Sequence, residues 1–208
     1  MGDGGGGGGE SVTRSAWLEL KDEERLMKEG YAFLDEKRMI LAAEMLKRLR
    51  LHDEREAHRS EGMAAAARAL TRAIERHGVD DTAAAAPGQI EGFESQTDRS
   101  NLLGVRIEDA RARIETGPPQ RPRVEPTTEL EDLAEAFSAL VPELFELAVA
   151  EGTLLRLTDE YASTERRARA LENVLLPELR DRLHFMGEQL EAMDQEDVVR
   201  VRFRKRDR

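Results

Sequence analysis

Two apolar repeats with a spacing of seven residues, one near each end of the chain, constrain the fold most strongly. The N-terminal repeat consists of Leu20, Met27, Leu34 and Leu41. The C-terminal repeat consists of Leu140, Leu147, Leu154, Tyr161, Ala168 and Leu175. Such a repeat places one narrow apolar stripe along a helix, and a second helix must cover that stripe in a left-handed supercoil. A segment rich in glycine and proline separates the repeats, so we expect the chain to fold back and the two helices to pair antiparallel.

The composition favours such a helix pair over a globular domain. Charged residues make up 36% of the chain and aromatic residues 4%, and the mean hydropathy is -0.61. A two-helix coiled coil needs apolar residues along its seam alone, so its other faces can carry charge. We therefore predict an all-α fold: a long antiparallel two-helix coiled coil of the N- and C-terminal arms. At the turn end we expect a short segment that is irregular, a β-hairpin or helical.

The chain is expected to divide into four segments. Residues 1–12 form a flexible tail, because six consecutive glycines are costly to order. Residues 13–77 form the N-terminal coiled-coil helix. Residues 78–127 hold five of the seven prolines and form a middle segment with a short β-hairpin. Residues 128–208 form the C-terminal coiled-coil helix and end in a basic tail.

Polar residues mark where both helices are expected to begin. Ser11 or Thr13 precedes the first apolar residues and offers an N-cap. Thr127 or Thr128, followed by Glu131, resembles a capping box at the start of the second helix.

Two further local patterns predict a hairpin and a bend. Residues 105–107 and 123–125 read as short strands on either side of the Gly-Pro-Pro break at 117–119. Pro177 lies inside the strongest apolar pattern and removes one backbone hydrogen bond. We expect a bend there that the helix survives.

Charge and residue types restrict the function classes. The formal net charge is -11, which disfavours generic binding to nucleic acids or anionic membranes. There is no cysteine, no signal-peptide pattern and no apolar run of the roughly 20 residues that span a bilayer. The four histidines lack metal-site spacing, and a two-helix rod buries no acid/base pair. We therefore expect a cytoplasmic protein without catalysis, cofactor or metal.

One stretch of sequence is specific enough to indicate a family. Residues 164–177 read TERRARALENVLLP. They closely resemble the signature of the D subunit of the V/A-type ATPases, roughly T-x-R-R-V-N-A-L-E-N-V-x-I-P, with Ala168 in place of valine and Arg169 in place of asparagine. Near the N-terminus, Thr13-Arg14-Ser15 with Leu18 and Leu20 looks like that family's T-R-x-x-L-x-x-L opening. Residues 34–38 are similar to its L-L-K-x-K-R segment, and residues 103–107 to its G-V-x-V-P, with Glu108 at the proline.

The resemblance implies a rotor. In this family, the D subunit is the central shaft of a rotary ATPase. Its paired terminal helices enter the ring of catalytic A and regulatory B subunits. Its middle end, together with the small F subunit, couples to the membrane-side rotor adaptor. ATP hydrolysis or synthesis in the ring is thereby linked to translocation of protons or sodium ions. The chain itself is then a non-catalytic subunit, peripheral to the membrane as part of the complex.

The resemblance also suggests roles for individual residues. Contact with the ring cavity is expected for six arginines: Arg14, Arg166, Arg167, Arg169, Arg202 and Arg204. Residues expected to form the seam or to set its shape are Leu34, Leu41, Leu154, Tyr161, Asn173 and Pro177. On spacing alone, the arginines read equally well as a solvated face.

The heptads by themselves leave a second interpretation open. A coiled-coil adaptor or export chaperone, similar to the rod proteins of flagellar export, would show the same repeats and act as an interaction module. The TERRARALENVLLP stretch favours the rotor, because an adaptor needs no such signature.

Overall fold

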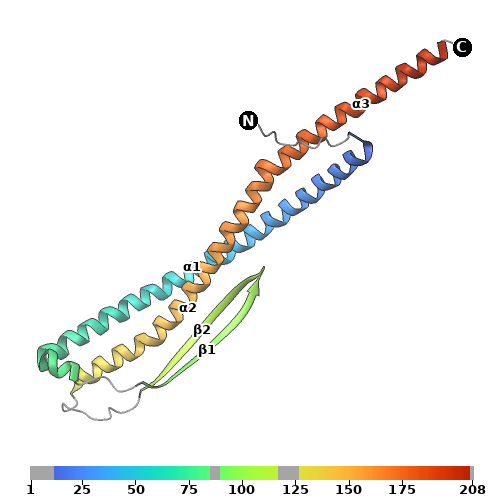
Figure 1. The fold of residues 1–208 in the computed structure, drawn as a ribbon. Helices are drawn as coiled ribbons and strands as arrows, with labels where there is room; N and C mark the ends of the chain where they lie inside the picture. The colour runs from blue at the N-terminus through green and yellow to red at the C-terminus, as the bar shows by residue number, and fades with distance from the viewer. Residues whose placement is uncertain (1–11, 85–89, 117–126, 207–208) are drawn as a thin grey trace, which may run out of the picture. The chain divides into compact units, whose positions relative to one another are not determined.

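A computed structural model describes residues 12–84, 90–116 and 127–206. Helix α1 spans Arg14–Ala84, and strands β1 and β2 span Ile90–Leu102 and Val105–Thr116. Helix α2, Thr128–Ala170, continues through a π-helical turn, Leu171–Leu175, into helix α3, Leu176–Arg206 (Figure 1). The described part of the chain is thus mostly helical with one hairpin, which confirms the predicted fold class. The expected glycine-rich tail lies, up to residue 11, outside the described residues.

Helix α1 begins at a threonine cap. The Thr13 hydroxyl accepts a hydrogen bond from the Ala16 backbone N–H at 3.2 Å, and the Thr13 carbonyl accepts one from Trp17 at 3.0 Å. This satisfies backbone donors that the first helical turn leaves free. The helix is interrupted at Gly78, whose φ of 78° and ψ of 168° are not helical. Glycine adopts this positive φ without steric penalty, so the chain bends there.

Helix α2 begins next to the end of the regular part of α1. The Thr127 carbonyl accepts hydrogen bonds from the backbone N–H groups of Leu130 and Glu131, both at 3.0 Å. Its hydroxyl lies 2.9 Å from Nε2 of His77. Glu129 and Glu131 in the first turn place negative charge at the positive end of the helix. Helix α2 therefore begins at the predicted threonines, while the side-chain cap itself stays a prediction.

The hairpin pairs different residues from those the sequence suggested. Strand β2 contains the predicted strand 105–107, but its partner is β1, with Leu102 opposite Val105 and Ser100 opposite Ile107. The predicted partner, 123–125, lies outside the described residues. The turn is formed by Leu103 and Gly104, with φ of 50° and 93°. Two positive φ values match the twist of a two-residue hairpin, and the Asn101 side chain accepts a hydrogen bond from the Gly104 N–H at 2.9 Å.

The chain divides into two compact units. The terminal unit comprises residues up to Met39 and from Ala162 onward, and the middle unit comprises Ile40–Tyr161. In the terminal unit, α1 and α3 pair antiparallel over a core of Leu20, Leu179 and Met186, on which Trp17 and Leu183 pack. The Trp17 indole N–H also donates to the Leu183 carbonyl at 3.3 Å.

The described residues of the middle unit form two apolar clusters. One joins three elements: Leu41 of α1, Val105 and Ile107 of β2, and Leu157 of α2. The other, around Ala69, Ala73 and Leu133, joins α1 to α2 near their connection. Alanines let the two helices approach closely there, while the first cluster holds the hairpin against the helices.

Candidate functional site

The π-helical turn is the main irregularity of the terminal unit. Pro177 has no N–H for the Asn173 carbonyl, and in a regular α-helix its ring would clash with that carbonyl. In the structure the Leu176 N–H instead donates to the Leu171 carbonyl, five residues earlier. The turn is therefore wider than an α-helical turn and takes up one extra residue. We call Leu171–Leu175 the wide turn.

The wide turn changes which residues face α1. Ala168 is buried, but the next buried residue is Leu176, eight positions later, and Leu175 is 39% exposed. Beyond it, Leu179 and Met186 are buried at a spacing of seven. The seam thus continues on both sides of the wide turn with its phase moved by one residue.

A row of polar contacts follows one flank of the seam. Glu24 accepts from Arg180 at 3.4 Å, Tyr31 shares a hydrogen bond with Glu172, and Arg38 donates to Glu165 at 2.6 Å. On α1 these residues are seven apart, whereas on the facing helix they are eight and then seven apart. The extra residue is again the one that the wide turn absorbs. We call this side of the helix pair the polar flank.

Charge on the polar flank shifts two ionisation equilibria. The hydrogen bond from Arg38 holds the pKa of Glu165 below its usual value, with Arg169 at 2.7 Å adding to the effect. Partial burial, followed by the nearby carboxylates of Glu172 and Asp35, raises the pKa of the Tyr31 hydroxyl. Glu165 is thus held as a carboxylate and Tyr31 as a neutral hydrogen-bond donor.

Acid is expected to weaken this flank. Because the pKa of Glu165 is lower in the folded state, its stabilising effect is present above the unfolded value of about 4.3 and is lost as the pH falls below it. The melting temperatures of the wild type and Glu165→Gln should therefore differ at pH 7 and converge toward pH 3. Glu178→Gln, at an exposed site on α3, serves as the control. A difference for Glu165→Gln that stays constant across this range would contradict the assignment.

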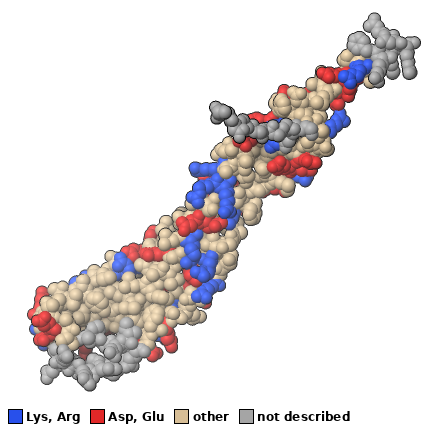
Figure 2. All heavy atoms as spheres, in the orientation of Figure 1, with Lys and Arg blue, Asp and Glu red and all other residues tan. Residues whose placement is uncertain are grey.

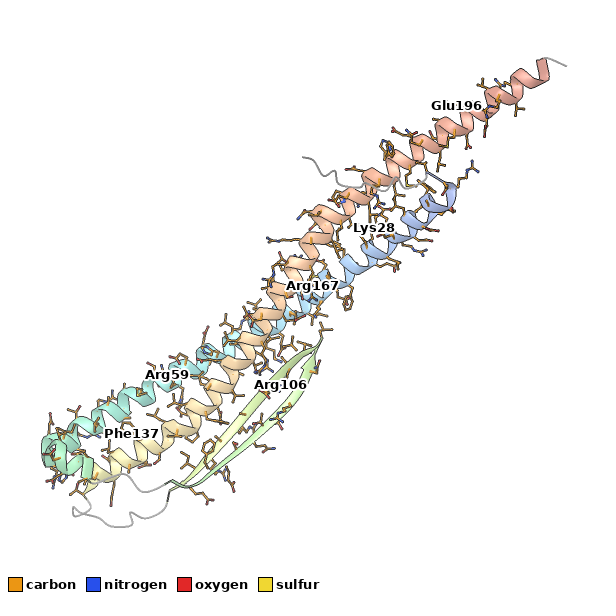
Figure 3. All side chains as sticks on the ribbon, in the orientation of Figure 1. Lys28, Arg59, Arg106, Phe137, Arg167 and Glu196 are labelled. Atoms are coloured by element: carbon orange, nitrogen blue, oxygen red, sulfur yellow. The ribbon has the colours of Figure 1, made fainter. Side chains whose placement is uncertain are left out.

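The six arginines expected to contact a ring lie in different surroundings. Arg166 and Arg167 are exposed, and neither has an ion pair within the described residues. Arg169 contacts Glu165, and Arg14 pairs with Asp194 at 2.5 Å. Arg202 is exposed, and Arg204 belongs to α3 but its side chain lies outside those described. Figure 3 marks Arg167 on its helix, and Figure 2 shows basic and acidic groups interspersed on the visible surface.

The expected seam residues also differ in burial. Leu41 is fully buried, Tyr161 packs against the same cluster, and Leu34 is half-buried. Leu154 and Tyr161 line an open apolar groove of about 430 Å³ with Met45 and Leu49. Asn173 is exposed and Pro177 half-buried, because the wide turn carries Asn173 away from α1.

Polar contacts join β2 to α2 in the middle unit, and the sequence alone did not predict them. We call this group of contacts the polar clamp. Thr153 is fully buried on α2, and its hydroxyl donates to the Glu108 carbonyl at 3.0 Å and accepts a hydrogen bond from the Glu108 N–H at 3.2 Å. Arg156 donates to the Arg106 carbonyl and to the Glu108 carboxylate, both at 3.0 Å. Threonine and arginine are common on helix surfaces, so their presence in α2 does not indicate a contact. That they bind β2 can be recognised only from the structure, in which β2 lies beside α2.

A second contact fixes the hairpin to α1. Arg48 donates two hydrogen bonds to the Asp109 carboxylate, at 2.9 and 3.0 Å, and a third to Glu44 at 2.7 Å. The hydrogen bond from Arg48 lowers the pKa of Asp109. With the clamp, this contact ties β2 to both helices of the middle unit.

The described residues offer neither a metal site nor a membrane span. Among them, no three side chains of histidine, aspartate or glutamate gather as metal ligands would. Within the same ranges, no helix is both long and apolar enough to cross a bilayer.

Comparison with known proteins decides the family. The family model for the ATP synthase D subunit matches residues 16–206. The chain belongs to the D-subunit family of ATP synthases. The match includes both helices of the terminal unit, the hairpin and the wide turn.

Curated members of the D-subunit family are similar over most of their length. The chain is 30% identical over 196 residues to the V-type ATP synthase D subunit of Thermus thermophilus, covering 92% of this chain and 86% of that protein. It is 30% identical over 200 residues to the A-type ATP synthase D subunit of Methanoregula boonei, covering 91% and 92%. It is 25% identical over 193 residues to the A-type protein of Haloarcula marismortui, covering 91% and 84%. The relatives are thus both V-type and A-type.

Proposed function

We propose that this chain is the central-stalk rotor subunit of a V/A-type rotary ATPase. It transmits torque between ATP hydrolysis or synthesis in the ring of A and B subunits and translocation of protons or sodium ions in the membrane sector. The observation that carries the proposal is the D-subunit family match, which extends over residues 16–206. The antiparallel helix pair of each unit suits a shaft, because two packed helices resist bending and twisting better than one.

The proposal assigns partners and leaves catalysis to them. The A and B subunits form the ring, and the F subunit and a membrane-side rotor adaptor bind the shaft outside it. ATP chemistry then takes place in the ring, and this chain is a non-catalytic subunit. It stays peripheral to the membrane within the complex, without inserting into it.

We propose that different segments of the chain have different roles. The arms 13–77 and 128–208 form the shaft, and the segment 78–127 with its hairpin lies toward the F subunit. Arg14, Arg166, Arg167, Arg169, Arg202 and Arg204 contact the ring, while Leu34, Leu41, Leu154, Tyr161, Asn173 and Pro177 set the seam and its shape.

The surface of the helices supports this role. A shaft turning in a sleeve needs contacts that form and break easily, and exposed ion pairs contribute only about 0–1 kcal/mol each. Charges of both signs are interspersed on the face shown in Figure 2. The wide turn also gives one helix of the terminal unit a local asymmetry that a regular coiled coil lacks. Such a feature lets a shaft present different sides to successive catalytic sites.

Isolation of the native complex tests this proposal. A tagged copy of the chain, purified from its own host at low salt, is expected to bring down the A and B subunits together with the F subunit, as identified by mass spectrometry. Recovery of export proteins without any ATPase subunit would contradict the rotor and support the coiled-coil adaptor instead. The family match favours the first outcome.

A further inference from the structure

An open cavity of about 520 Å³ lies between α1 and the hairpin of the middle unit. Six of the described residues that line it belong to α1, four to the hairpin and one to α2. Its volume falls within the range of small-molecule sites, roughly 300–1,000 Å³. The cavity therefore has room for a ligand of about the size of a nucleotide.

Most of the lining is charged, and part of that charge is already paired. Of the described lining residues, five are basic and four are acidic. The Arg48 guanidinium donates to the carboxylates of Asp109 and Glu44, as described above. The Glu146 carboxylate accepts a hydrogen bond from the Ala112 N–H at 3.2 Å. These contacts engage one of the basic lining residues and two of the acidic ones.

Three arginines of the lining have no counter-ion. Arg50 and Arg55 on α1 and Arg111 on β2 form neither an ion pair nor a hydrogen bond within the described residues. Glu54 and Asp98 line the same cavity, yet neither comes within ion-pair distance of these arginines. Three guanidinium groups are thus available to a ligand. We call the space lined by Arg50, Arg55 and Arg111 the arginine cavity.

A lysine adds to the positive charge at the arginine cavity. Lys47, Arg50 and Arg55 recur at helical spacing and therefore share the face of α1 that lines it. The hydrogen bond from Arg48 lowers the pKa of Asp109 most, and the nearby charges of Arg55 and Lys47 lower it further. Bringing cations together around one space is unfavourable unless an anion balances them.

The residue types of the arginine cavity indicate which anion fits. A planar guanidinium group donates two parallel hydrogen bonds, which match the oxygens of a phosphate group. The arginines come from two elements, and the cavity is much larger than one phosphate group, so it suits a chain of phosphates. Leu51, which is 43% exposed, and Ala110 add an apolar part beside the cations.

We propose that the arginine cavity binds a small molecule with two or more phosphate groups, such as pyrophosphate or a nucleoside diphosphate. Arg55 donates to the phosphate oxygens from α1 and Arg111 from β2, while Arg50 supplies a third guanidinium. A ligand held from both elements ties the hairpin to α1 in addition to the contact between Arg48 and Asp109. This inference concerns this chain alone and does not depend on the rotor proposal.

Calorimetric titration of the full chain with pyrophosphate, at physiological ionic strength and without divalent cations, tests the arginine cavity. Replacing both Arg55 and Arg111 by glutamine should weaken binding at least about tenfold, because charge-assisted hydrogen bonds are lost. Replacing both Arg68 and Arg113 by glutamine is the matched control. It removes the same charge from α1 and β2, at exposed arginines that do not line the cavity, and should leave the affinity unchanged.

Further measurements separate binding from folding and identify the ligand. Without ligand, the variant lacking Arg55 and Arg111 should melt no lower than the wild type, because neither residue forms an ion pair within the described ranges. Inorganic phosphate should bind at least about tenfold more weakly than pyrophosphate. Tighter binding of ADP than of pyrophosphate would support a nucleotide ligand, and equal binding would support recognition of the phosphate chain alone. No binding of either at millimolar concentration, or an equal loss of affinity in both double variants, would overturn the proposal.

Discussion

Replacing Leu157 by alanine is expected to destabilise the middle unit by about 2–5 kcal/mol, the usual cost of removing a fully buried leucine side chain. Leu157 has no exposed surface and belongs to the cluster of Leu41, Val105 and Ile107. The cavity would open where α1, α2 and the hairpin meet. We therefore expect a lower unfolding free energy in urea than for the wild type. The substitution should also accelerate amide exchange more in β2 than in the terminal unit.

Leu155 provides the control for this substitution. It lies two residues earlier on the same helix and is 67% exposed, so Leu155→Ala should change the unfolding free energy by no more than about 0.5 kcal/mol. An equal loss for both variants would mean that the cluster does not anchor the hairpin.

One-residue deletions are expected to have opposite effects at two sites of the terminal unit. Deleting Asn173 together with Pro177→Ala removes the extra residue and the proline that opposes a regular helix. The buried residues Ala168 and Leu176 are then seven apart, and α3 keeps its face toward α1. The melting temperature should remain within a few degrees of the Pro177→Ala parent.

Deleting Asp181 in the same Pro177→Ala background is the matched comparison. It keeps the extra residue and turns everything beyond it by about 100°, which moves Leu183 and Met186 off the seam. Losing the burial of two such side chains costs on the order of 3–6 kcal/mol. If the Asn173 deletion lowered the melting temperature as much as the Asp181 deletion, the wide turn would not contain an extra residue.

The sequence predicted the features that depend on spacing. The seven-residue repeats indicated the antiparallel pairing that joins Leu20 to Leu179 and Leu41 to Leu157 in the two units. The cap at Thr13 was also visible, because a hydroxyl before a run of helix formers has few other roles.

The wide turn could not be read from the repeats. The seven-residue repeat places Leu175 in the seam. The sequence predicts a bend at Pro177, but not that the repeat shifts by one residue there. A π-helical turn takes up one residue without altering the repeat on either side, so Leu176 rather than Leu175 is buried. The sequence alone shows a proline but not how the helix accommodates it.

The position of the hairpin turn could not be predicted from the sequence either. Gly-Pro-Pro at 117–119 is a strong break signal, whereas leucine at a positive φ is uncommon. The structure nevertheless turns at Leu103 and Gly104, because the contacts of Val105, Ile107 and Glu108 with the helices fix the register of β2. Tertiary contacts therefore set the position of this turn, which local sequence propensity does not predict.

Covalent attachment of the shaft to the ring tests the rotor claim most directly. The chain has no cysteine, so Arg202→Cys on α3 can be paired with one cysteine introduced into the ring. Oxidation of the assembled complex should abolish ATP turnover, and reduction should restore it, because a tethered shaft cannot rotate. Arg202→Cys without the ring cysteine should keep its activity under oxidation. Full turnover in a quantitatively cross-linked complex would contradict the account.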